Sequence, residues 1–150
     1  MPGHSAPEVP IGGRLRDTEL AGLNGPSSHL SAFRGRPLII NVWASWCGPC
    51  RQEMASLERL AWRNRPQYFG IIGISTDDYE DKAMTLLRDT HATISQFIDH
   101  ELRMERMLGA SRLPLTVLVA PDGRILLKVY GARDWDTAET LALIDATFRH

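Results

Sequence analysis

The fold is decided by the segment from Pro37 to Met54, which reads PLIINVWASWCGPCRQEM. Its first eight residues are almost all apolar and include β-branched and aromatic side chains, a pattern that predicts a strand buried on both faces of a sheet. After Cys50, apolar residues recur at helical spacing from Met54 to Ala61, which predicts a helix that ends near Pro66. Cys47 and Cys50 therefore lie between a buried strand and the first turn of a helix.

Outward from this segment, strands and helices alternate along the chain. A small hairpin is expected from Leu20 to Ser31, because Asn24-Gly25 is a tight-turn signal. Further strands are expected at residues 69–75, 97–98, 115–119 and 125–130, and helices at residues 80–90, at residues 102–108 and from Asp136 or Thr137 to Phe148. The last two strands flank Pro121-Asp122-Gly123, a hairpin signature. This order predicts an α/β fold with a central mixed β-sheet flanked by helices.

Composition bounds the domain organisation and the partners. The chain has 150 residues, of which 43% are hydrophobic, enough for one globular domain with its own core. Residues 1–19 combine prolines and glycines with little periodicity, so they are expected to form an extended arm or a leader, and residues 20–150 the domain. Seventeen basic and eighteen acidic side chains give a net charge of −1, which offers no electrostatic basis for binding nucleic acid.

The two cysteines form a Cys47-Gly48-Pro49-Cys50 motif. None of the five histidines lies within four residues of a cysteine, so no zinc site is expected and no metal ligand is assigned. A disulfide across two residues closes a tiny loop and would stabilise a domain of this size poorly. The motif therefore favours a redox-active pair over a structural disulfide or half of a metal site.

The two thiols are expected to differ. Cys47 precedes the helix, where unpaired backbone N–H groups and the helix dipole stabilise a thiolate, so its pKa is expected to fall from about 8.5 into the range of roughly 3.5 to 7.5. Cys50 shares the apolar stripe of Met54 and Leu57 and is expected to be more buried. Cys47 is thus the predicted nucleophile and Cys50 the resolving thiol. Pro49 takes an early helical position, where its missing N–H costs nothing.

These residues resemble the active-site segment of thioredoxin-fold proteins, and more narrowly of the TlpA/ResA/DsbE-like thiol-disulfide oxidoreductases. The narrower group often has asparagine at the position of Asn41 and glutamate at that of Glu53. The resemblance runs from about Leu20 to Phe148 and implies a thioredoxin-like fold with an N-terminal hairpin and a central insert, here residues 80–98. Two residues depart from the pattern: Ala55 and Leu115 replace a common proline and a common threonine.

The resemblance also implies functional residues. The Leu113-Pro114 bond is expected to be cis, although from position alone Pro114 could simply start a strand. The surface that binds the target is expected to comprise Trp46, Gly48, Pro49, Leu113 and Pro114. Glu53 allows two interpretations: a solvated carboxylate on the helix, or a group that accepts and returns the proton of Cys50, one turn away.

The function expected from the motif and the resemblance is that of a protein-disulfide reductase. The enzyme would work without a cofactor other than its Cys47–Cys50 pair. It would act as a monomer on oxidised proteins such as an apocytochrome c, in cytochrome c maturation, or a copper-site protein. An upstream membrane dithiol donor would regenerate it. The location implied is periplasmic or extracytoplasmic, with a signal or membrane anchor removed from the N-terminus.

Two other functions stay open. A thiol peroxidase usually has a Thr-x-x-Cys arrangement, and Ala44 stands at the matching position. A non-enzymatic copper or metal carrier would need a histidine or methionine placed to join the cysteine pair, and the sequence places none clearly. Peroxide consumption and a metal titration would separate these functions.

Overall fold

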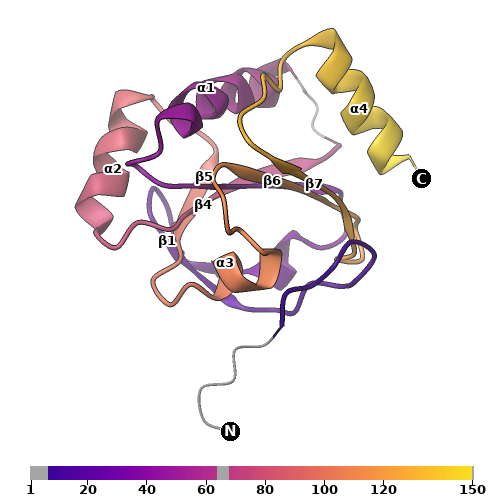
Figure 1. Cartoon of the computed structure of the whole chain (residues 1–150), viewed down its shortest axis with the longest axis horizontal. Coiled ribbons are helices and arrows are strands. Elements are labelled where there is room, and N and C mark those ends of the chain that lie inside the picture. The colour runs from indigo at the N-terminus through magenta and orange to yellow at the C-terminus, as the bar shows by residue number, and fades with distance from the viewer. Residues whose placement is uncertain (1–6, 64–67, 150) are drawn as a thin grey trace, which may run out of the picture.

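A mixed β-sheet forms the centre of the protein and is seen nearly edge-on in Figure 1. The computed structural model describes residues 7–63 and 68–149, and within these ranges the sheet has seven strands in the order β2-β1-β5-β4-β3-β6-β7. The strands are β1 (Glu19–Gly22), β2 (Ser28–His29), β3 (Leu38–Trp43), β4 (Gly70–Ser75), β5 (Ser95–Ile98), β6 (Leu115–Val119) and β7 (Ile125–Tyr130). The helices are α1 (Gly48–Arg63), α2 (Glu80–Asp89), α3 (Arg103–Leu108) and α4 (Ala138–Phe148), with a short 3-10 helix η1 (Leu30–Phe33).

The predicted central strand is confirmed. All six residues of β3 are buried, and β3 pairs in parallel with β4 and antiparallel with β6. Strands β4 and β5 are also parallel, whereas β6 and β7 form the predicted antiparallel hairpin. Gly123 in the turn of that hairpin has a φ of 92°, a conformation that favours glycine. The thioredoxin-like α/β fold expected from the sequence is therefore the fold observed.

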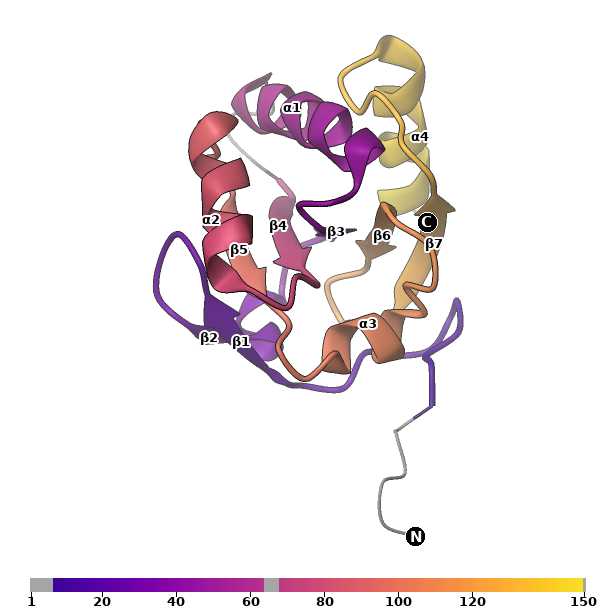
Figure 2. The same cartoon turned by 60° about the vertical axis from the view of Figure 1, so that its left-hand side comes forward.

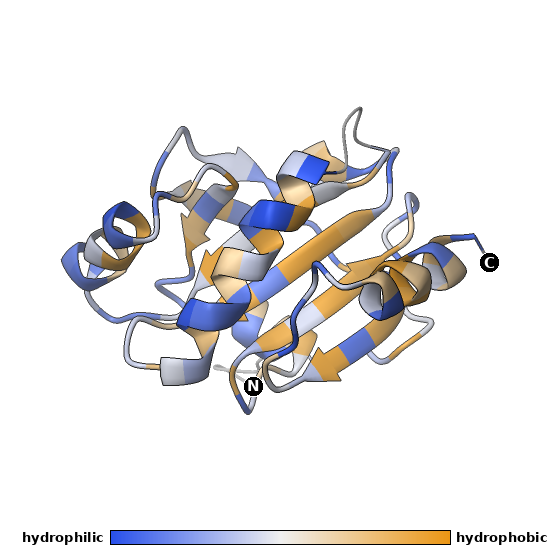
Figure 3. Ribbon diagram, turned by 90° about the horizontal axis from the view of Figure 1, so that it is seen from above, coloured by the Kyte–Doolittle hydropathy of each residue, from blue (hydrophilic) through white to orange (hydrophobic). Residues whose placement is uncertain are grey.

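The two faces of the sheet are covered by different elements, as Figures 1 and 2 show: α1, α2 and α4 lie on one side and α3 on the other. Alternate residues of β3 serve the two faces. Ile40 and Val42 pack with Met104 and Leu108 of α3, whereas Ile39 packs with Leu57 of α1. Figure 3 shows the central strands as mostly hydrophobic ribbon beneath α1. Asn41 thus faces α1 from within an apolar strand.

The segment before the sheet packs on the α3 side. Val9 and Leu15 are buried, and backbone hydrogen bonds join Val9 N–H to the Met107 carbonyl (2.8 Å) and Leu15 N–H to that of Gly123 (2.9 Å). Val9 and Leu15 therefore belong to the core on this side of the sheet. Within the described residues, none of the helices is both long and apolar enough to cross a membrane.

The N-terminal hairpin is present but differs from the prediction in two details. Asn24 does not make a tight turn, because its side-chain amide bonds both the Ile94 carbonyl and the Gln96 N–H, each at 2.9 Å. Leu30 and Ser31 do not extend β2, because Asp17 accepts the Ser31 N–H (2.8 Å) and stabilises the 3-10 turn η1. Both side chains satisfy backbone groups that strand pairing would otherwise use.

The predicted helices are confirmed, with small shifts at their ends. Thr137 is the N-cap of α4, and its hydroxyl accepts the Thr140 N–H (3.1 Å). Gly109 ends α3 with a φ of 73°. The predicted end of the first long helix near Pro66 lies outside the described residues.

Candidate active site

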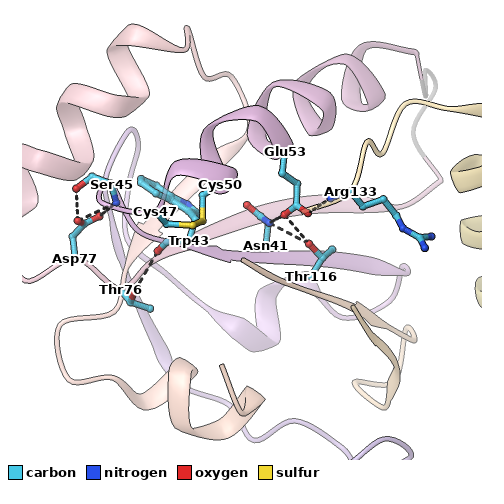
Figure 4. Close-up of a disulfide and its surroundings, with 10 residues drawn as sticks. All are labelled: Asn41, Trp43, Ser45, Cys47, Cys50, Glu53, Thr76, Asp77, Thr116 and Arg133. Carbon is cyan, nitrogen blue, oxygen red and sulfur yellow. Dashed lines mark hydrogen bonds between the residues drawn. A yellow bond between two sulfur atoms is a disulfide. The ribbon is translucent and has the colours of Figure 1, made fainter. Parts of the chain in front are cut away.

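The two cysteines meet where β3 leads into α1. Cys47 and Cys50 form a disulfide with Cα atoms 5.4 Å apart, and α1 begins at Gly48, directly after Cys47 (Figure 4). The turn that precedes the helix is closed by a hydrogen bond from Cys47 N–H to the Ala44 carbonyl (3.1 Å). Cys50 is fully buried, whereas Cys47 retains 7% of its exposure. The predicted order of burial is observed.

The disulfide lies in an apolar cluster. Trp43 and Met54 flank it, and α2 contributes three further buried members of the cluster, Ala83, Leu86 and Leu87. The indole N–H of Trp43 donates to Gln96 Oε1 (2.8 Å). The Gln96 side chain covers Gly73, where a Cβ atom would collide with it. Gln96 and Gly73 therefore fix the ring of Trp43, one of the members of the cluster that holds the disulfide.

The residues predicted to bind the target lie around the disulfide. Trp46 is 73% exposed, and Gly48 and Pro49 are also exposed. Leu113 is half-buried and packs against the cluster that contains both cysteines. The Leu113–Pro114 bond is cis, and the Pro114 carbonyl accepts the Gly131 N–H (2.9 Å). The fold thus brings a distant loop to the redox pair, with an exposed tryptophan next to it in the chain.

Glu53 is buried, not solvated. The side chain points from α1 toward the sheet, and the residue is 1% exposed, so the interpretation of a carboxylate on the solvated face of the helix is wrong. Asn41 Nδ2 donates to Glu53 Oε1 at 2.7 Å and Thr116 Oγ1 donates to it at 3.2 Å, while the Arg133 backbone N–H donates to Oε2 at 2.9 Å. Asn41 and Thr116 face each other across β3 and β6. Their pairing places both side chains under the helix.

Burial controls the protonation of this carboxyl. Removal from water raises the pKa of Glu53 above its ordinary value, and the hydrogen bonds that it accepts act in the opposite direction. A pocket of about 420 Å³ that opens to the surface adjoins Glu53 and has room for water. It is lined by Gln52, Glu53, Ala55, Ser56, Arg59, Ala132, Arg133 and Asp134. A buried carboxyl with a raised pKa, one helical turn from Cys50 on α1, holds its proton more tightly than an exposed glutamate and is placed to exchange it with that thiol.

Sequence reasoning missed some of the polar partners of the site. Thr116 and Arg133 lie 63 and 80 residues beyond Glu53 in the chain, and no local pattern connects them. Asp77 was also missed; it accepts hydrogen bonds from Ser45, two residues before Cys47. A signal for Asp77 did exist, because polar residues directly after one parallel strand lie beside the end of the next. In the described residues, no group of three or more histidine, cysteine or acidic side chains is placed to hold a metal ion.

Comparison with known proteins identifies the family. A family model described as Redoxin matches residues 2–144. The chain belongs to the Redoxin family. The thiol:disulfide interchange protein DsbE of Vibrio cholerae is 35% identical over 116 residues, which cover 75% of this chain and 60% of that protein. The thiol-disulfide oxidoreductase ResA of Bacillus thuringiensis subsp. konkukian is 22% identical over 132 residues, covering 88% of this chain and 76% of the relative.

A solved structure gives the same result for the fold. The crystal structure of a DsbE-type thiol:disulfide interchange protein from Chlorobium tepidum superposes with a TM-score of 0.84 and is 26% identical, covering 93% of this chain and 99% of that one. This member of the Redoxin family is accordingly a thiol-disulfide oxidoreductase of the ResA and DsbE type, with Cys47 and Cys50 as its close cysteine pair.

Proposed function

We propose that the enzyme reduces or exchanges disulfides of extracytoplasmic proteins through Cys47 and Cys50. The Cys47 thiolate attacks one sulfur of the target disulfide, forms a mixed disulfide and releases the other target sulfur as a thiolate. Cys50, as a thiolate, then attacks the Cys47 sulfur. This step expels the second target sulfur and leaves the Cys47–Cys50 disulfide. The target gains two electrons, and an upstream dithiol donor restores the reduced enzyme.

The observation that carries this proposal is the unequal environment of the two sulfurs. Cys47 lies at the N-terminus of α1, next in sequence to Trp46, which is 73% exposed, whereas Cys50 is fully buried. A helix N-terminus favours the thiolate form of Cys47. Burial leaves Cys50 able to react only with a sulfur already attached to its neighbour. The nucleophile is therefore Cys47 and the resolving thiol Cys50.

Glu53 supplies the proton chemistry of the buried thiol in this proposal. Cys50 must lose a proton before it can attack the mixed disulfide, and water does not reach it readily. The carboxylate of Glu53, held by Asn41 and Arg133, accepts that proton and returns it when the disulfide is reduced again. The raised pKa of Glu53 brings its proton affinity closer to that of a thiol, which favours transfer.

Target binding is assigned to the surface around Cys47. Trp46, Gly48 and Pro49 are exposed there, and Leu113 and Pro114 form the facing loop. The backbone of Leu113 is proposed to pair with an extended segment of the target, as strand additions do. Trp46 offers a broad apolar surface with little conformational entropy to lose.

The resemblance to ResA and DsbE supports the assignment of partners and location. We infer a periplasmic or otherwise extracytoplasmic location and targets such as apocytochrome c or copper-site proteins, in cytochrome c maturation. The upstream donor is a membrane dithiol protein. The enzyme acts as a monomer and needs no cofactor besides its own disulfide. The peroxidase alternative is disfavoured by Ala44, which is buried and has no hydroxyl to offer a peroxide.

Alkylation and trapping of partners test the proposal. In the reduced protein, iodoacetamide near neutral pH is expected to label Cys47 well ahead of Cys50, as read by peptide mass spectrometry. Cys50→Ser is expected to accumulate a mixed disulfide with an oxidised protein substrate, and Cys47→Ser, its matched control, to accumulate little. Equal labelling of the two cysteines, or equal trapping by the two variants, would contradict the assignment. Peroxide consumption that exceeds protein-disulfide reduction would favour the peroxidase.

A further inference from the structure

A buried carboxylate outside the cysteine motif holds the turn that carries the nucleophile. Asp77 is 4% exposed and follows β4. The Ser45 N–H donates to both oxygens of Asp77, at 2.9 and 3.1 Å, and the Ser45 hydroxyl donates to Oδ1 at 2.5 Å. Ser45 is the second residue of the turn that the hydrogen bond from Cys47 N–H to the Ala44 carbonyl closes. Asp77 therefore binds the inside of that turn through three hydrogen bonds.

Asp77 is itself held in place by hydrogen bonds at the ends of the neighbouring strands. The Ser75 hydroxyl donates to Asp77 Oδ2 (2.7 Å) and accepts the Asp77 N–H (3.0 Å). Thr76, which lies between Ser75 and Asp77 in the chain, donates its N–H to the Trp43 carbonyl (2.9 Å). This hydrogen bond joins the ends of β3 and β4. Ser75 is also tied to the end of β5, since its carbonyl accepts the Asp99 N–H (2.8 Å). The carboxylate thus projects from the fixed ends of three parallel strands.

Figure 4 shows Ser45 and Asp77 on one side of the disulfide and Glu53 with its partners on the other. Glu53 is connected to Cys50, because both residues lie on α1. Asp77 is connected to Cys47, because it accepts a hydrogen bond from the turn that ends at Cys47. The two carboxylates therefore act on different cysteines, and their effects can be separated by mutation.

We propose that Asp77 is a positioning residue for Cys47, which it keeps in the geometry needed for the disulfide with Cys50. The inference rests on the proposed function, in which Cys47 is the nucleophile. When the pair is reduced, no covalent bond restrains the turn, and the hydrogen bonds to Asp77 restrain it instead. A turn already held in the disulfide geometry loses little entropy when the bond forms. Asp77 therefore stabilises the disulfide relative to the dithiol and makes the enzyme a stronger reductant.

The chain offers a matched control next to Asp77. Asp78 is exposed and carries the same side chain, so Asp78→Asn changes the net charge in the same way without touching the turn. Asp77→Asn replaces one acceptor oxygen by an amide that donates, and so cannot accept all the hydrogen bonds from Ser45 and Ser75. Ser45→Ala removes the hydroxyl hydrogen bond alone and changes no charge.

The test is the equilibrium constant for disulfide formation against glutathione. Asp77→Asn is expected to lower it about tenfold, which corresponds to a reduction potential less negative by about 30 mV. Ser45→Ala is expected to lower it about threefold, and Asp78→Asn to stay within a factor of two of the parent protein. Iodoacetamide labelling of Cys47, measured from pH 5 to 9, is expected to change its pH profile in Asp77→Asn and to keep it in Asp78→Asn. Thermal unfolding of each oxidised protein reports whether the fold is retained.

Three results would overturn the inference. One is a folded Asp77→Asn protein with the equilibrium constant and pH profile of the parent. Another is an equal shift in Asp78→Asn, which would assign the effect to net charge rather than to the turn. If Asp77→Asn does not fold, Ser45→Ala decides, and a parental equilibrium constant in that variant rejects the role of the turn. The proposed function fails separately, if the parent protein does not label first at Cys47 or does not reduce disulfides.

Discussion

Replacement of Glu53 by glutamine is expected to change how stability depends on pH. Burial raises the pKa of Glu53 in the folded protein above the ordinary value of 4.5. Well below pH 4.5 the side chain is protonated in both the folded and the unfolded chain, so it makes no pH-dependent contribution. As the pH rises through the folded pKa, the unfolded chain ionises more easily and the folded protein loses stability relative to it. A glutamine side chain does not ionise, so the Glu53→Gln variant escapes this loss.

The size of the effect depends on how far the folded and unfolded pKa values of Glu53 differ. Each unit between the folded and unfolded pKa values of Glu53 corresponds to about 1.4 kcal/mol of unfolding free energy lost by the parent protein at higher pH. The amide of the variant presents two N–H donors toward the groups that donate to Glu53, Asn41 and the Arg133 N–H, where the parent carboxyl presents at most one O–H donor, and this costs about 1–3 kcal/mol. The stability advantage of the parent is therefore expected to be largest in acid and to shrink, or reverse, toward pH 8.

Urea unfolding of the oxidised proteins from pH 4 to 8 measures the difference in unfolding free energy between the parent and Glu53→Gln. The cysteines are in the disulfide under these conditions, so they do not titrate. Glu139→Gln, the same change at an exposed position of α4, controls for other effects of the substitution. An unfolding free-energy difference between parent and Glu53→Gln that stays constant across this range would refute the argument, because it would mean that burial leaves the carboxyl unperturbed. In the reduced proteins, Glu53→Gln should in addition alter the pH profile of disulfide exchange.

Four further substitutions have effects that follow from the burial, exposure or hydrogen bonds of the replaced side chain. Leu57→Ala removes a side chain that is 2% exposed between α1 and the sheet and is expected to cost about 2–5 kcal/mol in chemical denaturation. Thr137→Ala removes the N-cap of α4 and is expected to cost about 0.5–2 kcal/mol in the same assay. Trp46→Ala is expected to slow reduction of a protein substrate while unfolding stays within about 0.5 kcal/mol, since the ring is 73% exposed. Burial and the hydrogen bond to Asp145 raise the pKa of Tyr68 to about 12, so Tyr68→Phe should remove a phenol that ionises near pH 12 in an ultraviolet titration.

Each of these four predictions would be contradicted by a specific result. Unchanged stability in Leu57→Ala or Thr137→Ala would contradict the packing of α1 or the cap of α4. An unaltered rate with protein substrates in Trp46→Ala would remove that residue from the binding surface. A titration curve that is the same near pH 12 with and without Tyr68 would contradict its environment.

Periodicity predicts the segments that carry the redox pair. The apolar run before Cys47 and the helical spacing after Cys50 are local patterns, and each gives the same element in the structure. The β6–β7 hairpin is predicted equally well, because a Pro-Asp-Gly turn specifies its own geometry. Such signals lie within a few residues of the elements they specify.

The predictions for the N-terminal hairpin are wrong where a side chain forms hydrogen bonds with the backbone of a distant segment instead of with its own neighbours. The local pattern predicts a tight turn at Asn24, but this residue bonds backbone groups at Ile94 and Gln96. It also predicts that the hairpin strand continues through Leu30, but Asp17 draws the next residue into a 3-10 turn. In both places a long-range hydrogen bond competes with a local preference and prevails.

By itself, the sequence determined the strand, the helix and the cysteine pair between them, because the apolar run, the helical spacing and the Cys-Gly-Pro-Cys motif are all local. Only the tertiary structure decided what surrounds that pair. Glu53 accepts hydrogen bonds from residues 12, 63 and 80 positions away, and Asp77 holds a turn 32 positions before it. The exclusion of water that shifts the pKa of Glu53 arises only when the helix closes over the sheet, since a helical spacing alone does not say how deeply each position is buried.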